Sequence, residues 1–235
     1  MKKVLLTGAK GFIGRNFFKQ YVGKYDFVCT DIEDMDEYHG VDAVVHLGAY
    51  AGVRRSHEIP EEFWAYNVEA SERLFDKYCR TPIVYASSSS IYEWWLSPYA
   101  TTKKVMEQIA PSNTLGLRFH TVYGDDSRPD MLYDKLKRQD VSYITNHTRD
   151  WTHVFDVCSA IDLCLDKFDE LKHHRAIDVG NGTPITVKQL ADHLWPNNNL
   201  PIKDVKGERE HTCADPSILL ASGWKPCYHP LDETE

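Results

Sequence analysis

The sequence lacks a long apolar segment. No hydrophobic run approaches the roughly 20 residues that a helix needs to cross a bilayer, which argues against a membrane-spanning protein. The first residues, Met1–Gly11 (MKKVLLTGAKG), join two lysines to a short apolar run, but a glycine-rich stretch follows at once. We therefore interpret them as a first β-strand and not as a signal peptide.

Paired cysteines and an excess of positive charge are missing too. The six cysteines form no C-x-x-C pair, which argues against a disulfide framework and favours a reduced, cytoplasmic protein. The eleven histidines show no convincing ligand spacing, so we expect no metal. The formal net charge of −8 argues against nucleic acid as a partner. An anionic ligand must then be met by local groups.

Three glycines lie where a strand-like run passes into a helical pattern. Thr7–Gly14 reads T-G-A-K-G-F-I-G, between the apolar run Lys2–Leu6 and a helix expected over Phe12–Tyr21. Glycines at this spacing permit a tight turn and a close approach of the backbone to a pyrophosphate, which then sits on the helix N-terminus. A tight turn without a ligand is the alternative.

An acid follows at the spacing of a ribose-binding carboxylate. A second strand is expected over Phe27–Thr30, and Asp31 comes seventeen residues after Gly14, against the roughly 20 typical of dinucleotide-binding folds. A carboxylate there accepts hydrogen bonds from a free 2′-hydroxyl and repels a 2′-phosphate. The sequence therefore predicts a dinucleotide site that prefers NAD to NADP.

Strand-like and helix-like segments alternate from residue 2 to residue 180. Alternation of this kind is typical of an α/β doubly wound parallel sheet, the Rossmann fold. We expect the NAD-binding domain over residues 1–124 and 150–182. Residues 125–149 and 183–235 are too short for an independent domain, so we expect a small lobe over the carboxyl ends of the strands, where ligands bind.

Polar residues beside two buried segments are candidates for binding. After the apolar run Val41–Ala49, a loop is expected, in which Arg54 and Arg55 could meet a phosphate or a carboxylate, or stay solvated. In the helix expected over Glu61–Tyr78, Asn67 is the polar member of an apolar stripe. It needs a partner if it is buried, and an asparagine at the edge of the core is the alternative.

The stretch Val84–Lys103, VYASSSSIYEWWLSPYATTK, collects groups that exchange protons. It begins as an apolar strand, passes through four serines and ends in a helix expected to start at Ser97 and Pro98. Tyr99 and Lys103 lie four residues apart on one helical face, so we expect the ammonium to lower the pKa of the phenol. With a strand-end serine, this pair would act as general acid or base. Because Y-x-x-x-K alone is weak, an ordinary amphipathic helix is the alternative.

Several motifs occur in the order found in one known family. They are Thr7–Gly14, His46–Ala49, the serine-rich strand end, Tyr99-x-x-x-Lys103 and Arg149–Thr152, with similar runs at Ala51–Arg54, Leu117–Gly124, Arg128–Asp130, Gly180–Pro184 and Gly223–Pro226. Together they resemble the extended short-chain dehydrogenase/reductases, in particular the nucleotide-sugar epimerase/dehydratase group. The branch most similar to this chain is that of the UDP-glucuronate 4-epimerases, and the likeness extends over nearly the whole sequence.

The resemblance implies three sets of site residues and no metal. The catalytic residues would be Ser88, Tyr99 and Lys103. The residues that bind NAD would be Gly8, Gly11, Phe12, Ile13, Gly14, Asp31, Ile32, Leu47, Gly48, Ala49 and Asn67, together with Tyr99 and Lys103. The residues that bind a nucleotide-diphospho-sugar would be Arg54, Ser89, Ser90, Thr121, Arg128 and Arg149.

The resemblance also implies a reaction. Tyr99 would take the proton of the sugar 4-hydroxyl while hydride passes to NAD, and the 4-keto sugar would turn before hydride returns to its other face. Ser89 and Ser90 stand where 4,6-dehydratases carry an acidic pair, which favours an epimerase. A nucleotide-sugar reductase of the same superfamily and a catalytically silent dinucleotide-binding module are the alternatives. Relatives pair as homodimers through helices that correspond to Glu61–Tyr78 and Tyr99–Ala110.

The chain is shorter than is usual for that family. Nine residues separate Asp31 from Val41, so one strand–helix unit of the Rossmann half is expected to be missing. Cys29–Ile32 would then belong to the second strand or to a later one that contacts adenine, and the spacing favours the second. Six residues separate Tyr92 from Tyr99, where relatives carry a longer loop. We infer a pared-down enzyme with a site more open to water.

Overall fold

A six-stranded parallel sheet forms the centre of the protein. The structure is a computed structural model that describes residues 1–30, 38–124 and 126–232. In sheet order the strands are β10 (Ala176–Val179), β5 (Thr114–Phe119), β4 (Ile83–Ser88), β3 (Ala43–His46), β1 (Lys2–Thr7) and β2 (Tyr25–Thr30). Every pairing among them is parallel. The predicted doubly wound α/β sheet is confirmed.

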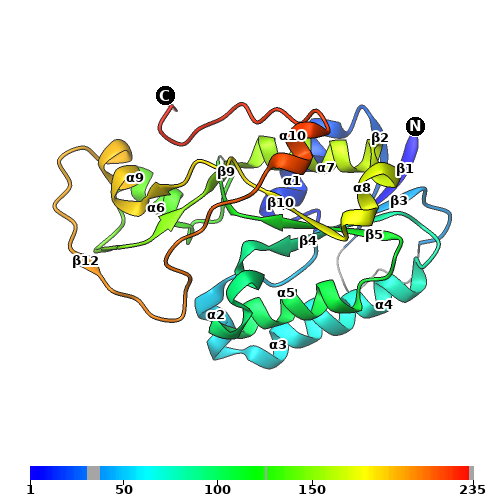
Figure 1. The fold of residues 1–235 in the computed structure, drawn as a ribbon, viewed down its shortest axis with the longest axis horizontal. Helices are drawn as coiled ribbons and strands as arrows, with labels where there is room; N and C mark the ends of the chain where they lie inside the picture. Colours follow the sequence, from blue (N-terminus) through cyan, green and yellow to red (C-terminus); the bar gives the residue numbers. More distant parts are fainter. Residues whose placement is uncertain (31–37, 125, 233–235) are drawn as a thin grey trace.

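Helices cover both faces of the sheet (Figure 1). One face carries α1 (Phe12–Tyr21), α7 (Val154–Asp166) and α8 (Phe168–Leu171), and the other carries α3 (Pro60–Trp64), the π-helical turn η2 (Ala65–Glu69), α4 (Ala70–Lys77) and α5 (Pro98–Ile109). Because successive strand residues point to opposite faces, Val4 and Leu6 join the first core and Leu5 joins the second. A strand buried on both sides explains the continuous apolar runs in the sequence.

The edge of the sheet beside β1 settles one alignment question. β2 pairs with β1 from Lys2 opposite Tyr25 to Thr7 opposite Thr30, so Cys29 and Thr30 belong to the second strand, as the spacing favoured. In the described part of the chain no further strand pairs with β2. Asp31 and Ile32, the residues predicted to bind the cofactor ribose, lie outside the described residues.

A small lobe stands beside the carboxyl ends of the strands (Figure 1). It contains α6 (Leu132–Lys137), α9 (Val187–Leu194) and three two-stranded pairs: β6 (Thr121–Tyr123) with β9 (Trp151–His153), β7 (Ile144–Thr145) with β12 (Ile202–Lys203), and β8 (Thr148–Arg149) with β11 (Ile185–Thr186). Its own apolar core includes Tyr133, Leu136 and Leu190. Helix α9 begins at a capping box formed by Thr186 and Gln189.

The last part of the chain leaves the lobe and returns to the main core. Helix α10 (Ser217–Ala221) places Leu219 there, and Trp224 is buried beside it. The indole Nε1 of Trp224 donates to the backbone oxygen of Asp156 over 3.2 Å and to the hydroxyl of Ser159 over 3.0 Å. The expected lobe segment 183–235 therefore includes a stretch that packs on the Rossmann domain.

Two local features differ from the expectation. Residues expected as a loop after β3 form helix α2 (Val53–Glu58), and the helix expected over residues 61–78 is interrupted by the π-helical turn η2. Two short 3₁₀ segments complete the elements, η3 (Ser89–Leu96) and η4 (Lys172–His174). Among the described residues, no helix has both the length and the apolar character that a membrane crossing requires.

Candidate active site

The glycine loop between β1 and α1 is shaped by the absence of side chains. Gly8 has φ of 68°, and a Cβ added to it would lie 2.6 Å from the backbone nitrogen of Gly48 at the end of β3. A Cβ on Gly14 would collide with the carbonyl oxygen of Gly8. Gly11, at the helix N-cap, has no side chain to occupy the free N–H groups of α1. This cradle fits a dinucleotide pyrophosphate.

The other predicted cofactor residues surround this cradle. Phe12 and Ile13 open α1, and Leu47 and Ala49 follow β3, all four half-buried. Phe12, Ile13 and Leu47 pack against the main core on one side. The structure thus brings together the glycine loop and the end of β3, which are far apart in the sequence but predicted to share one site.

A buried histidine joins the two strand ends, and the sequence reasoning did not single it out. The Nδ1 of His46 lies 2.7 Å from the hydroxyl of Thr7, and its Nε2 lies 2.9 Å from the hydroxyl of Ser71. The Thr7 hydroxyl also accepts from the backbone N–H of Gly48. Burial, followed by the nearby Lys103, lowers the pKa of His46 to about 3, so the imidazole is neutral. A polar residue inside an apolar strand was the signal that could have found it.

Asn67 connects the loop after β3 to the helix that carries Tyr99. Its side-chain oxygen accepts from the N–H of Tyr50 over 2.7 Å, and its amide nitrogen donates to the oxygen of Tyr50 and the hydroxyl of Thr102, each over 3.0 Å. Thr102 in turn donates to the carbonyl of Tyr99. Since Asn67 has no exposed surface, its side chain positions these segments and does not touch a ligand directly. Its predicted part in binding the cofactor stays a prediction.

Ser88, Tyr99 and Lys103 meet where β4 ends and α5 begins. The helix starts as the sequence predicted, because the Ser97 side chain caps it and Pro98 occupies its first turn. Ser88 ends β4 and forms a hydrogen bond with the phenol of Tyr99. Lys103, only 2% exposed, donates from Nζ to the carbonyl of Ala86 over 2.8 Å. The structure thus brings Ser88 to the phenol of Tyr99 and Lys103 to the backbone of the same strand, and the catalytic roles of the three residues stay predictions.

The electrostatics of the trio differ from the expectation. Burial raises the pKa of Tyr99, and the hydrogen bond from Ser88 and the charge of Arg128 act in the lowering direction. Burial also lowers the pKa of Lys103 to about 7, against a smaller opposing effect of Glu107. The expectation that Lys103 lowers the pKa of the phenol is wrong for this geometry. The physical reason is that the phenol itself is buried, while the Lys103 ammonium is directed at the carbonyl of Ala86.

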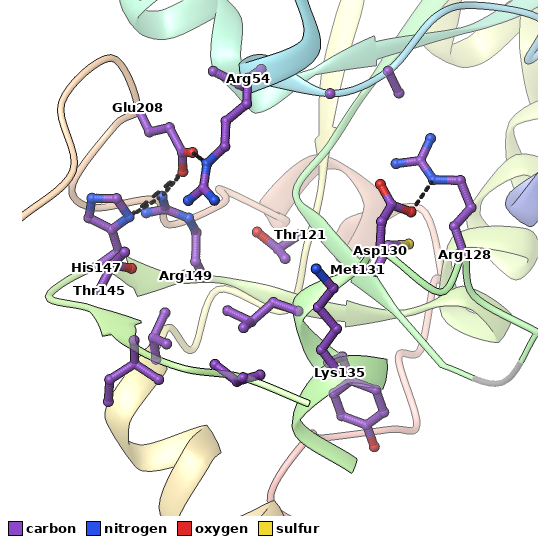
Figure 2. Close-up of a pocket in the computed structure, with 18 of the residues that line it drawn as sticks. Arg54, Thr121, Arg128, Asp130, Met131, Lys135, Thr145, His147, Arg149 and Glu208 are labelled. Carbon is purple, nitrogen blue, oxygen red and sulfur yellow. Dashed lines mark hydrogen bonds and ion pairs between the residues drawn. The ribbon is translucent and has the colours of Figure 1, made fainter. Parts of the chain in front are cut away.

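A cavity of about 960 Å³ opens between the Rossmann domain and the lobe. Four of the residues predicted to bind substrate line it (Figure 2): Arg54 from α2, Thr121 from β6, Arg149 from β8, and Arg128 from the segment before α6. Ser89 and Ser90 are not among its lining residues. The cavity and the trio are neighbours, since α2, which carries the cavity residue Arg54, packs against α5, which carries Tyr99 and Lys103.

The cations of the cavity face acids and bases of the protein itself. Arg149 lies 2.8 Å from Nδ1 of His147 and 3.4 Å from the carboxylate of Glu208, which also lies 3.0 Å from Nε of Arg54 (Figure 2). Arg128 pairs with Asp130 over 3.4 Å. Burial lowers the pKa of Arg149, and Glu208 partly offsets that effect. Sequence reasoning missed Glu208 and His147, because nothing in their spacing links them to Arg54.

A buried carboxylate holds Arg149 in place. Asp150 has no exposed surface and accepts three backbone hydrogen bonds of 2.9 Å, from Asn181, Gly182 and Ala214. These donors come from two separate segments that flank the lobe. The side-chain oxygen atoms satisfy backbone N–H groups that would otherwise be buried without partners. Asp150 therefore fixes the strand end from which Arg149 reaches the cavity.

The connection between β4 and α5 lies outside the cavity. Trp94 and Trp95 contact each other edge to face at 6.0 Å and are 43% and 64% exposed, so they do not wall the pocket. Tyr92 lies 5.3 Å from the guanidinium of Arg118 and the same distance from that of Arg209. Arg209 also donates to the carbonyl of Ser89 over 3.0 Å. The residue next to Glu208 thus ties the lobe to the serine strand.

Comparison with known families agrees with this geometry. The profile of the NAD dependent epimerase/dehydratase family matches residues 4–180, which is more than half of the chain. The protein belongs to that family. The expectation from the sequence resemblance, including NAD as the family's cofactor, is confirmed at this level.

Individual proteins show the same relationship. The uncharacterized protein MJ1055 of Methanocaldococcus jannaschii is 29% identical over 96% of this chain and 91% of its own length. UDP-glucuronate 4-epimerase 4 of Arabidopsis thaliana is 32% identical over 63% of this chain and 44% of its own. Among solved structures, MoeE5 in complex with UDP-glucuronic acid and NAD superposes with a TM-score of 0.83 at 25% identity, covering 97% of this chain and 94% of that one.

Proposed function

We propose that the protein is an NAD-dependent epimerase that acts on a nucleotide-diphospho-sugar, with 4-epimerisation of a UDP-glucuronate-like substrate as the reaction. The observation that carries the proposal is the meeting of two parts: the Ser88–Tyr99–Lys103 trio and a cavity lined by Arg54, Arg128 and Arg149. The relatives support it, because they include a UDP-glucuronate 4-epimerase and a protein crystallised with UDP-glucuronic acid and NAD.

The chain's own residues would divide the work as follows. The glycine cradle of Gly8, Gly11 and Gly14 binds the pyrophosphate of NAD, which supplies the acceptor and donor of hydride when bound. Tyr99 exchanges the proton of the sugar 4-hydroxyl, and Ser88 holds the phenol in place through its hydrogen bond. Because burial lowers the pKa of Lys103 to about 7, its protonation responds to charge in the site. The cavity arginines hold the diphosphate.

The residues at the end of β4 favour epimerisation over loss of water. Elimination requires an acid and a base beside the sugar, and the strand ends instead in Ser87, Ser88, Ser89 and Ser90. Serine hydroxyls do not take up a proton at neutral pH. The homodimer, the cytoplasmic location and the residue ranges of the two domains stay predictions. Light scattering tests the homodimer.

The test is turnover of UDP-glucuronate and, separately, of UDP-glucose, with chromatographic separation of the sugars. We expect conversion of UDP-glucuronate to its 4-epimer without net consumption of NAD. Tyr99→Phe is expected to lower kcat by about 10²–10⁴-fold, because the proton-transfer group is removed. Tyr228→Phe, at a half-exposed tyrosine outside the cavity, is the matched control and should turn over normally. Equal rates for Tyr99→Phe and the unmodified protein would falsify the mechanism, and steady consumption of added NADH would favour the reductase alternative.

A further inference from the structure

Two arginines of the cavity share one acidic partner. The carboxylate of Glu208 places Oε1 at 3.0 Å from Nε of Arg54 and Oε2 at 3.4 Å from a terminal nitrogen of Arg149. Nδ1 of His147 is 3.8 Å from the same carboxylate (Figure 2). In the described part of the cavity, Glu208 is the acid that joins the two guanidinium groups.

The two arginines have different surroundings, and among the described residues the Glu208 carboxylate contacts both of them. Arg149 has 13% of its side chain exposed and donates from Nη1 to the carbonyls of Thr148 and Glu210, so its place is fixed by the backbone. Arg54 is 62% exposed at the start of α2. Arg54 is held by side chains, those of Glu208 and Tyr143, whereas Arg149 is also held by the backbone and is the fixed half of the pair.

A carboxylate between two guanidinium groups presents anionic oxygens to both of them, as a bound phosphate would. Part of the favourable interaction between the arginines and an incoming anion is consequently already made inside the protein. A ligand that displaces Glu208 must recover that interaction through its own oxygens. A diphosphate has oxygens on two phosphorus atoms with which to reach both arginines, whereas a neutral nucleoside offers no charge to compete.

We propose that Glu208 is a specificity-determining residue: its carboxylate occupies the diphosphate position between Arg54 and Arg149 and is displaced only by a ligand anionic enough to replace it. The inference rests on the proposed function, because that function supplies the diphosphate. It goes beyond that function because it states that one residue of the lobe, Glu208, selects ligands by their negative charge. The segment that carries Glu208 is also held by the neighbouring residue, since Arg209 donates to the carbonyl of Ser89.

The test is calorimetric titration of the whole protein and of Glu208→Gln with UDP, UMP and uridine. The amide keeps the shape of the side chain and removes its charge. Glu208→Gln is expected to bind UDP about tenfold more tightly, equivalent to about 1.4 kcal/mol, with uridine unchanged. The gain in UDP affinity should shrink in high salt, because the competing interaction is ionic.

The matched control is Glu210→Gln. It removes the same charge from the same segment, but only the backbone carbonyl of Glu210 contacts Arg149. It should bind UDP as the unmodified protein does. Glu208→Asp, which keeps the charge on a shorter side chain, is expected to bind UDP with intermediate affinity and serves if the amide loosens the fold.

Three outcomes would overturn the inference: UDP affinity that is unchanged or weaker in Glu208→Gln, an equal gain in Glu210→Gln, or no UDP binding by either the unmodified protein or Glu208→Gln. Binding needs no turnover, so the proposed function is judged separately. If Glu208→Gln gains affinity for UDP while the unmodified protein fails to epimerise UDP-glucuronate, the proposed reaction is wrong and the role of Glu208 stands.

Discussion

The glycine cradle and the arginine cavity are two binding regions built on opposite principles. In the cradle, backbone lies against backbone, and Gly8 and Gly14 leave no room for a Cβ. In the cavity, long charged side chains from α2, β8 and the segment before α10 form ion pairs with one another. The first region is complementary in shape before any ligand arrives. In the second region, the charges of the arginines are already paired with an acid, so an anionic ligand must replace that acid as their partner.

This difference predicts how each region responds to substitution. A close-packed backbone contact cannot relax locally, so a single added methyl group there lowers the stability of the whole fold. Exposed ion pairs such as that of Arg54 contribute little to stability, because solvent screens them and ordering the side chains costs entropy. Changes in the cradle should therefore lower stability and cofactor binding together, whereas a change at Arg54 should alter affinity and leave stability nearly intact.

The largest effect is expected at the cradle. Gly8→Ala puts a Cβ against Gly48 at a φ of 68°, which few side chains adopt, and should lower the free energy of unfolding by about 3 kcal/mol. Denaturant unfolding and the fluorescence of bound NADH measure the two losses. Gly23→Ala is the control, because a Cβ there meets nothing within 4 Å. A Gly8→Ala protein as stable as Gly23→Ala would remove the distinction between the regions.

An intermediate effect is expected in the cavity. Arg149→Met should weaken UDP binding by about 10–100-fold, since charge-assisted hydrogen bonds to the diphosphate are lost. Arg54→Met should cost less, because Arg54 is far more exposed and its interaction is screened. Titration calorimetry gives the affinities and thermal unfolding gives the stabilities. A loss of UDP affinity that is larger for Arg54→Met would contradict the division into a fixed and a more exposed arginine.

The smallest effect is a pH dependence at Lys103, which is buried against the carbonyl of Ala86. Its pKa is lowered by burial to about 7 from an ordinary 10.5. Between these values the unfolded chain binds the proton and the folded protein does not, so this group makes stability rise with pH. The slope is at most about 1.4 kcal/mol per pH unit.

The comparison that isolates this group is Lys103→Met. Denaturant unfolding of both proteins at several values between pH 7.5 and 9.5 (roughly the middle of the window) should give a difference in stability that changes with pH in favour of the unmodified protein. Groups other than Lys103 titrate alike in the two proteins and cancel. Parallel curves would show that the ammonium keeps its ordinary pKa.

Some parts of the site were predictable because their signals are local. The turn at Gly8–Gly14 depends on residues close in sequence, and so does the cap of α5 by Ser97. The π-helical turn at Asn67 and helix α2 were not predicted. Both depend on packing against α5, which a single-segment pattern does not contain. The direction of the Tyr99 pKa was mispredicted for a related reason: four residues of helical spacing do not say that Lys103 bonds to Ala86.

The sequence by itself determined the parallel sheet, the glycine cradle and the family, because each rests on periodicity or on motifs confined to a short stretch. Only the tertiary structure decided which charges face one another. Glu208 reaches Arg54 and Arg149 because the chain folds back over the lobe before α10, and Coulombic interaction depends on distance in space and not on distance along the chain.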